Sequence, residues 1–154
     1  MLLERVEVSN FYRINISFTM KPKTATRILL SILISFTVFH IGVLLKVVPA
    51  KIVWGGRLVS ESEIYLFESV SIVMLLYLIF ILLMKASVIR PIFSPKVISI
   101  SLWAFLILFI LNTIGNLLSK TITEQSFALL TLVIALLLWA ILKNHNHKKA
   151  DNQP

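Results

Sequence analysis

The sequence predicts an all-α integral membrane protein, an antiparallel bundle of four transmembrane helices. The first observation is composition: 58% of the 154 residues are hydrophobic and 14% are charged. A soluble domain carries about 45–50% apolar and about 25% charged residues, so this chain has too little polar surface for a water-soluble globule. The second observation is four long apolar stretches, at residues 28–45, 64–84, 97–118 and 127–142, and the third is that all five prolines fall outside them. Because proline breaks helices, this placement suits four uninterrupted ones.

The four apolar stretches have the length that a transmembrane helix needs. With their flanking turns, each reaches the roughly 20 residues that cross about 30 Å of hydrocarbon. Long runs without alternation exclude a β-barrel, so helices are the remaining way to satisfy the backbone in lipid. The predicted spans are residues 28–45, 61–84, 95–118 and 122–142. They lie in a transmembrane domain, residues 24–143, between an amino-terminal cytoplasmic extension, residues 1–23, and a cytoplasmic polar tail, residues 144–154.

Local signals mark the starts of the last three helices. Residues 60–63 and 121–124 both match Ser/Thr-x-x-Glu, the capping box in which side chains satisfy the first free backbone N–H groups. Ser94 precedes Pro95, and an N-cap serine followed by proline at the first helical position is typical of a helix start.

The basic residues predict which side each loop occupies. Most of the 15 lysines and arginines fall in the amino-terminal extension, in residues 85–96 and in the tail. By the positive-inside rule both termini are therefore cytoplasmic. Acidic and basic residues balance on the outer side, so the net charge of +8 is cytoplasmic. This excess is a topology signal that also suits anionic lipid headgroups, and no nucleic-acid partner is expected.

Two alternatives concern the amino terminus. Met20 begins a segment that looks like a translation start, so residues 1–19 can be an optional extension. Residues 21–50 also resemble a signal peptide, with a small-residue site at 48–50. The apolar run is longer than the usual 7–15 residues and contains a histidine, which favours a retained helix.

Polar side chains within the spans gather at one depth. At 1.5 Å per residue, His40, Glu68, Asn112 and Asn116 lie roughly 6–12 Å below the outer ends of their helices. The inner halves of the spans carry only hydroxyl groups, which can bond to their own helix. This one-sided cluster predicts a pocket open to the outside, and not a polar path across the membrane.

Glu68 is the central residue of this cluster. A carboxylate below the headgroups is costly unless it is protonated, paired or hydrated, and such groups usually face a cavity. The expected partners of the Glu68 carboxylate are Arg57, His40 and the asparagine amides. The alternative is that the side chain extends the short distance to the water on the outer side. For His40 the alternative is a neutral imidazole bonded to a neighbour. For Asn112 and Asn116, which share a stripe with Gly115, it is helix-to-helix packing.

The loop at residues 51–58 is the most distinctive outer segment. Its two adjacent glycines allow close backbone approach, and Trp54 suits an interface. Arg57 offers a planar fork for a carboxylate or phosphate. An ordinary turn, with Trp54 and Arg57 at the lipid headgroups, explains the same residues equally well.

Several classes of chemistry are excluded by what the sequence lacks. It contains no cysteine, so disulfide exchange, thiolate metal sites and iron–sulfur clusters are excluded. His40 is the one histidine in a span, whereas a haem held by two histidines needs a second at matching depth. There is no phosphate loop, nucleophile elbow or paired-histidine zinc motif. We therefore assign no catalytic residue, cofactor or metal.

Two short motifs resemble a group of small four-span bacterial membrane proteins to which no activity is assigned. They are Ile-Val-Trp-Gly-Gly-Arg-Leu at residues 52–58 and Asn-Thr-Ile-Gly-Asn at residues 112–116. The resemblance covers residues 26–143. It implies a multi-pass protein of the bacterial cytoplasmic (inner) membrane, and it supports the loop and the asparagine stripe forming one site.

Three classes of function remain open. The first is a ligand-binding or transport-related protein, in which Glu68 carries a charge or proton and transport would require a homo-oligomer. Its ligand, a small molecule or lipid, would contact His40, Trp54, Arg57, Glu68, Asn112 and Asn116. The second is an accessory or assembly subunit without a ligand of its own. The third is a membrane enzyme acting on a lipid or isoprenoid, with His40 and Glu68 as an acid–base pair.

Overall fold

The computed structural model describes residues 21–54, 58 and 60–150, and within them it contains helices and no strand. The helices are α2 (Pro22–Leu44), α3 (Lys51–Trp54), α4 (Glu61–Lys85), α5 (Pro95–Leu117) and α6 (Ile122–Ala150). Four of them, α2, α4, α5 and α6, are long and apolar enough to cross a membrane. The predicted all-helical architecture with four long apolar helices is therefore confirmed.

The predicted helix starts are present. The Ser60 side chain accepts from the backbone N–H of Glu63 at 3.2 Å, and the Glu63 carboxylate accepts from that of Ser60 at 3.2 Å, which completes the capping box of α4. Ser94 Oγ accepts from the backbone N–H of Val97 at the start of α5. Thr121 Oγ1 accepts from that of Glu124 at 3.3 Å before α6.

Two helix boundaries and one additional helix differ from the sequence prediction. Helix α2 begins at Pro22, well before the apolar run, because proline at the first turn is already set for a helix. Helix α6 continues to Ala150, through much of the predicted polar tail. The loop between α2 and α4 contains the single turn α3, which no pattern in the sequence had indicated.

Helices α2 and α4 end in the same way. Lys46 (φ 60°) and Ser87 (φ 57°) adopt the left-handed conformation just beyond the two helices. The next backbone N–H then turns back to the last helical turn, from Val47 to Gly42 O at 2.9 Å and from Val88 to Leu83 O at 3.0 Å. A Cβ at Gly42 would lie 3.2 Å from Val48, so a larger residue would crowd the turn that leads into α3.

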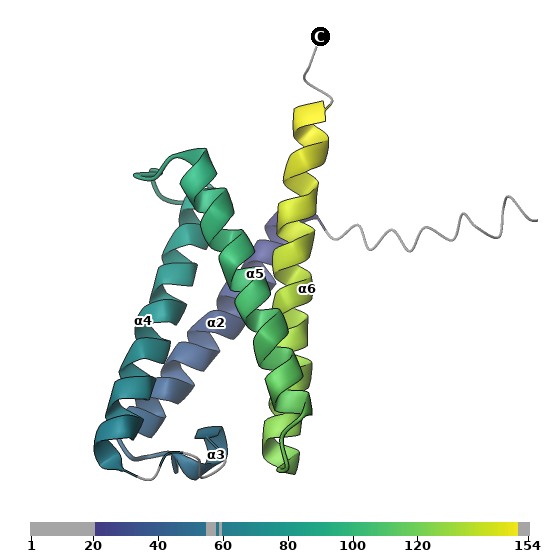
Figure 1. Ribbon diagram of the computed structural model, residues 1–154. Helices are drawn as coiled ribbons and strands as arrows, with labels where there is room; N and C mark the ends of the chain where they lie inside the picture. The colour runs from purple at the N-terminus through teal and green to yellow at the C-terminus, as the bar shows by residue number, and fades with distance from the viewer. Residues whose placement is uncertain (1–20, 55–57, 59, 151–154) are drawn as a thin grey trace, which may run out of the picture.

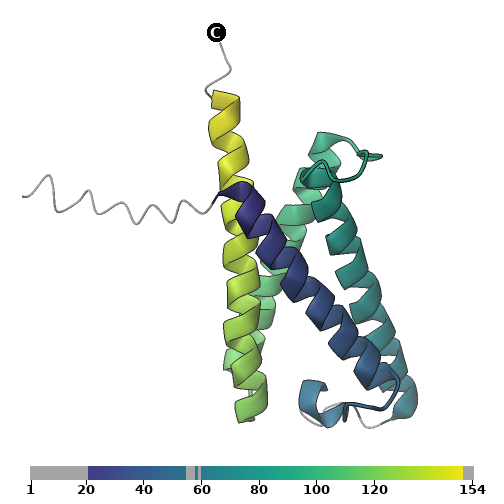
Figure 2. The same ribbon diagram turned by 180° about the vertical axis from the view of Figure 1, so that it is seen from behind.

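The four long helices form a wedge (Figure 1). Helix α2 packs against α4 and α6, and α5 packs against α6 and α4. Helices α4 and α5 meet at their connection, residues 86–94, and diverge toward the other end, where α3 lies (Figure 1). From behind, α2 runs from α6 to α4 (Figure 2). We call the half next to residues 86–94 the closed half and the half next to α3 the open half.

The two halves bury different residues. The closed half holds the apolar core, whose fully buried side chains are Leu29, Leu33, Leu78, Ile81, Leu82, Leu102, Ile134 and Leu138. The buried polar side chains, apart from Thr26, lie in the open half: Thr37, Glu68, Thr113, Glu124 and Thr131. The helices of the closed half thus pack tightly through apolar side chains, whereas α4 and α5 lie farther apart in the open half.

Candidate functional site

Glu68 is the centre of the polar residues in the open half. Its side chain is 0% exposed. One carboxylate oxygen, Oε2, lies 2.7 Å from Nδ1 of His40, and the other, Oε1, accepts from Nε1 of Trp54 at 2.7 Å. Each oxygen is therefore bonded to a different element, α2 or α3, and the acid on α4 connects all three.

The short helix α3 places Trp54 against Glu68. Trp54 is the last residue of α3, and its ring lies 5.4 Å from the ring of Phe67, the residue that precedes Glu68 on α4. A half-buried indole N–H needs an acceptor, and the carboxylate supplies it. Of the partners expected from the sequence for Glu68, which were Arg57, His40 and the amides, His40 is present, and the hydrogen bond from Trp54 was not predicted. The signal that could have predicted this bond is a tryptophan in one segment and an acid in the segment that follows it.

The bond to Glu68 fixes the orientation of His40. Nδ1 of His40 lies 2.7 Å from Glu68 Oε2, and it donates this hydrogen bond when the carboxylate is ionised, because an ionised carboxylate only accepts. The opposite nitrogen, Nε2, has no hydrogen bond within the part of the chain that the structure describes. No buried side-chain nitrogen or oxygen there lacks a partner, so Nε2 is accessible. The imidazole therefore has one nitrogen held by the protein and one free to meet a ligand.

His40 and Trp54 line a cavity of about 500 Å³ in the open half, which we call the α4–α5 cavity. Small-molecule sites are typically about 300–1,000 Å³, mostly apolar and with a few placed polar groups. Its polar lining residues are His40, Trp54, Ser71, Asn112, Asn116 and Thr131. Its apolar lining residues are Phe36, Phe39, Val53, Phe67, Val70, Met74, Leu75, Phe105, Leu108, Phe109 and Phe127. All five described helices contribute to its wall.

The α4–α5 cavity opens sideways. Its exposed lining residues belong to α4 and α5, and they are Phe67, Val70, Met74, Leu108 and Asn112. In the closed half the same two helices touch, where Tyr77 Oη lies 2.9 Å from Ser101 Oγ. The exposed lining residues therefore place the opening between α4 and α5. It lies in the half where these two helices diverge (Figure 1).

Both predicted asparagines line the cavity. Asn112 is exposed and Asn116 is half-buried, and neither side chain has a hydrogen bond to another described residue. A Cβ at Gly115 would meet nothing within 4 Å, so no other helix packs closely against this glycine. The polar link between α5 and α6 is instead Thr113 to Thr131, whose hydroxyl oxygens lie 2.9 Å apart. The sequence analysis did not identify this threonine pair.

The predicted site residues thus fall into three groups. His40 and Trp54 are each hydrogen-bonded to Glu68, and Asn112 and Asn116 lie on the wall of the cavity that His40 and Trp54 also line. Arg57, predicted as a counter-ion or anion clamp, lies outside the described residues.

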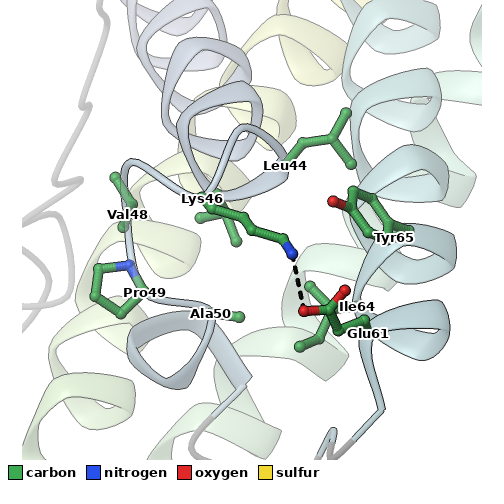
Figure 3. Close-up of a pocket in the computed structure, with 9 residues that line it drawn as sticks. Leu44, Lys46, Val48, Pro49, Ala50, Glu61, Ile64 and Tyr65 are labelled. Atoms are coloured by element: carbon green, nitrogen blue, oxygen red, sulfur yellow. Dashed lines mark hydrogen bonds and ion pairs between the residues drawn. The ribbon is translucent and has the colours of Figure 1, made fainter.

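A smaller hollow of about 190 Å³ lies at the end of α2 (Figure 3). Lys46 Nζ lies 2.8 Å from Oε1 of Glu61 across it and 5.7 Å from the centre of the Tyr65 ring. The hydrogen bond that Lys46 donates to Glu61 raises the pKa of Lys46 above its ordinary value of 10.5. Both charged side chains are more than half exposed, so this pair ties the end of α2 to α4 at the surface.

The arrangement around Glu68 can bind a polar group and exchange a proton with it through His40. Among residues 21–54, 58 and 60–150, no three histidines or acids come together in a way that could hold a metal ion. Comparisons with protein families, with curated proteins and with solved structures give no match to this chain. Its function is therefore argued from this geometry.

Proposed function

We propose that this chain is a multi-pass protein of the bacterial cytoplasmic membrane that binds a small ligand in the α4–α5 cavity. The proposal rests on Glu68. An acid within an apolar helix is costly, and such groups generally pair with another residue and mark a functional site. Here the acid is fully buried and accepts from His40 and Trp54, two residues on the wall of a cavity of about 500 Å³.

Charge supports an orientation with the closed half toward the cytoplasm. The basic residues described near the closed end are Lys21, Lys23, Arg27, Lys85, Arg90, Lys96 and Lys143. Those described near the open end are Lys46, Lys51 and Lys120, and Lys46 is paired with Glu61. By the positive-inside rule both termini are then cytoplasmic and α3 lies outside. Alkaline phosphatase fused after Lys120 should be active, and the same fusion after Arg90 should be inactive; the reverse would contradict this orientation.

Binding accounts for the two halves better than passage through one chain. The polar lining of the α4–α5 cavity lies in the open half, and the apolar core fills the closed half. A polar solute crossing the bilayer would therefore need a route between copies of the chain in a homo-oligomer. A ligand resident in the open half needs no such route.

Native mass spectrometry of the protein extracted from its own membrane tests for a bound ligand. The wild type should carry an adduct of defined mass. Ser71→Trp should remove it, because Ser71 lines the cavity and its hydroxyl donates back to Phe67 O of its own helix, so the larger side chain fills the cavity without breaking a bond between helices. Val73→Trp is the matched control, since Val73 lies on the same helix, is 63% exposed and does not line the cavity.

The outcome that would contradict binding is equally specific. If the wild type carries no adduct, or if Ser71→Trp and Val73→Trp retain it equally, the cavity does not hold a ligand. An accessory or assembly subunit, whose polar residues only position its helices, would then be the better explanation.

A membrane enzyme acting on a lipid is a second candidate, because His40 Nδ1 and Glu68 Oε2 lie 2.7 Å apart. A carboxylate that orients an imidazole is an arrangement suited to acid–base chemistry at the free nitrogen. Glu68→Gln separates the two proposals. An enzyme would accumulate substrate in this variant, so the adduct mass would differ from that of the wild type, whereas a binding protein would carry the same mass in both.

A further inference from the structure

Three polar side chains on the wall of the α4–α5 cavity have hydrogen-bonding capacity left over. They are His40, through Nε2, and the amides of Asn112 and Asn116. An amide group both donates and accepts, and an imidazole nitrogen accepts when neutral and donates when protonated. A hydroxyl group also does both, so it matches this wall in either protonation state of His40.

The charge of the cavity wall argues against an anionic headgroup. None of the residues that line the α4–α5 cavity in the described helices is lysine or arginine. With Glu68 ionised, the His40–Glu68 pair carries a net charge of zero or minus one, whether or not the imidazole is protonated. Within the described lining, a phosphate or carboxylate at His40 would therefore lose its hydration without meeting a net positive charge, which is costly in an apolar site.

The remainder of the cavity suits an apolar chain. Aromatic and aliphatic side chains form most of the wall, and the opening lies between α4 and α5, where the exposed lining residues are mostly apolar. An amphiphile could therefore enter from the bilayer with its chain among the phenylalanines and its headgroup at His40. The volume of about 500 Å³ is that of a single small molecule.

We infer that the ligand of the α4–α5 cavity is an uncharged single-chain amphiphile with a hydroxyl headgroup, an alkyl or isoprenoid alcohol, held at His40, Asn112 and Asn116. This inference rests on the proposed function, because it names the class of ligand that the cavity binds.

Quenching of Trp54 fluorescence by brominated amphiphiles tests it. In the full chain, Trp103→Phe and Trp139→Phe leave Trp54 as the one tryptophan of the three; both replaced side chains are nearly half exposed. The protein in phosphatidylcholine vesicles is titrated with 2-bromododecan-1-ol, with 2-bromododecane and with 2-bromododecyl phosphate, because a headgroup at His40 then places the bromine near Trp54. Ser71→Phe in the same background blocks the cavity and measures the quenching that comes from probe dissolved in the bilayer.

The alcohol should quench Trp54 saturably and at the lowest membrane mole fraction of the three probes. One hydrogen bond from the wall is worth about a threefold to tenfold preference over the alkane. Asn112→Leu should reduce that preference by a similar factor, and it should fold normally because the Asn112 side chain bonds to no described residue. Ser126→Leu is its matched control, since Ser126 is exposed, bonds back to Ile122 O and lies outside the cavity lining.

Each other outcome overturns a defined part of the argument. Tighter quenching by the phosphate ester would make the ligand anionic, which refutes the inference and leaves the proposed function standing. Equal quenching by alcohol and alkane would show that the wall makes no headgroup contact, which also refutes it. If no probe quenches beyond the Ser71→Phe background, the cavity holds no such molecule, and the proposed function loses its support together with the inference.

Discussion

The closed and open halves of the bundle are built from the same four helices but are held together differently. In the closed half, leucines such as Leu82 and Leu138 fill the space between helices completely. In the open half, the polar links are Glu68 with its two donors and the hydroxyls of Thr113 and Thr131. In lipid the apolar packing is driven by close contact and not by escape from water. Many small contacts therefore stabilise the closed half, and a few directed bonds stabilise the open half.

The two polar links of the open half also differ from each other. Thr113 Oγ1 lies 2.8 Å from Phe109 O, and Thr131 Oγ1 lies 3.0 Å from Phe127 O, so each hydroxyl has a partner on its own helix. Both hydrogen-bond partners of the Glu68 carboxyl group lie on other helices, His40 on α2 and Trp54 on α3. The threonine pair would stay satisfied if its helices separated, whereas Glu68 would not. This dependence is the reason to place the function at Glu68.

The largest effect is expected in the closed half. Leu138→Ala removes a fully buried side chain from the core and should lower the free energy of unfolding by about 2–4 kcal/mol, because the cavity it leaves loses close contacts on all sides. Reversible unfolding in mixed micelles measures it. Leu136→Ala is the control, since Leu136 is 55% exposed on the same helix and its loss should change stability by less than about 0.5 kcal/mol. Equal effects would mean that the closed half is not packed as described.

The next effect is expected at Glu68. Glu68→Leu keeps a similar volume but leaves the N–H groups of His40 and Trp54 without an acceptor, which should lower the free energy of unfolding by about 1–3 kcal/mol. Adding His40→Leu removes one of the stranded donors, so the double variant should lose less than the sum of the two single changes. Strict additivity in this cycle would indicate that the two side chains do not interact.

A smaller effect is expected for the threonine pair. Thr131→Val removes one hydroxyl, but Thr113 retains its bond to Phe109 O, so the loss should be about 0.6 kcal/mol, typical of a hydrogen bond between membrane helices. Thr123→Val, at an exposed position on the same helix, is the control. A loss as large as that of Glu68→Leu would remove the distinction between the two polar links.

The sequence predicted the features that depend on local chemistry. The Ser60–Glu63 capping box and the Ser94-Pro95 start follow from the needs of a helix terminus, and both are present. Depth along each helix also placed His40 and Glu68 at one level, because the rise per residue is constant. The regular geometry of a helix was therefore enough to predict which side chains lie at the same depth.

The features that the sequence did not predict depend on how the helices cross. The bond from Trp54 to Glu68 requires the one-turn helix α3, whose place is set by the left-handed residue Lys46 at the end of α2. The cavity requires α4 and α5 to diverge. Neither helix carries a pattern of side chains from which the angle between the two could be predicted. The Asn112 and Thr113 side chains are adjacent in sequence, yet one faces the cavity and the other faces α6. Only the packed arrangement distinguishes them.

The smallest effect is expected at the surface pair of Lys46 and Glu61, outside the α4–α5 cavity. The pKa of Lys46 is raised in the folded chain by its bond to Glu61, so the stability that this pair contributes is fully present below the unfolded pKa of about 10.5. It is lost as the pH rises through the higher folded pKa. The stability difference between wild type and Glu61→Gln should therefore shrink between pH 8 and pH 12, and salt should reduce it because both side chains are mostly exposed.

Since neither residue lines the cavity, Glu61→Gln should leave Trp54 quenching by the bromoalcohol unchanged at pH 8. A change in that quenching would mean that the surface pair and the cavity are coupled through α4, and that the open half responds as one unit.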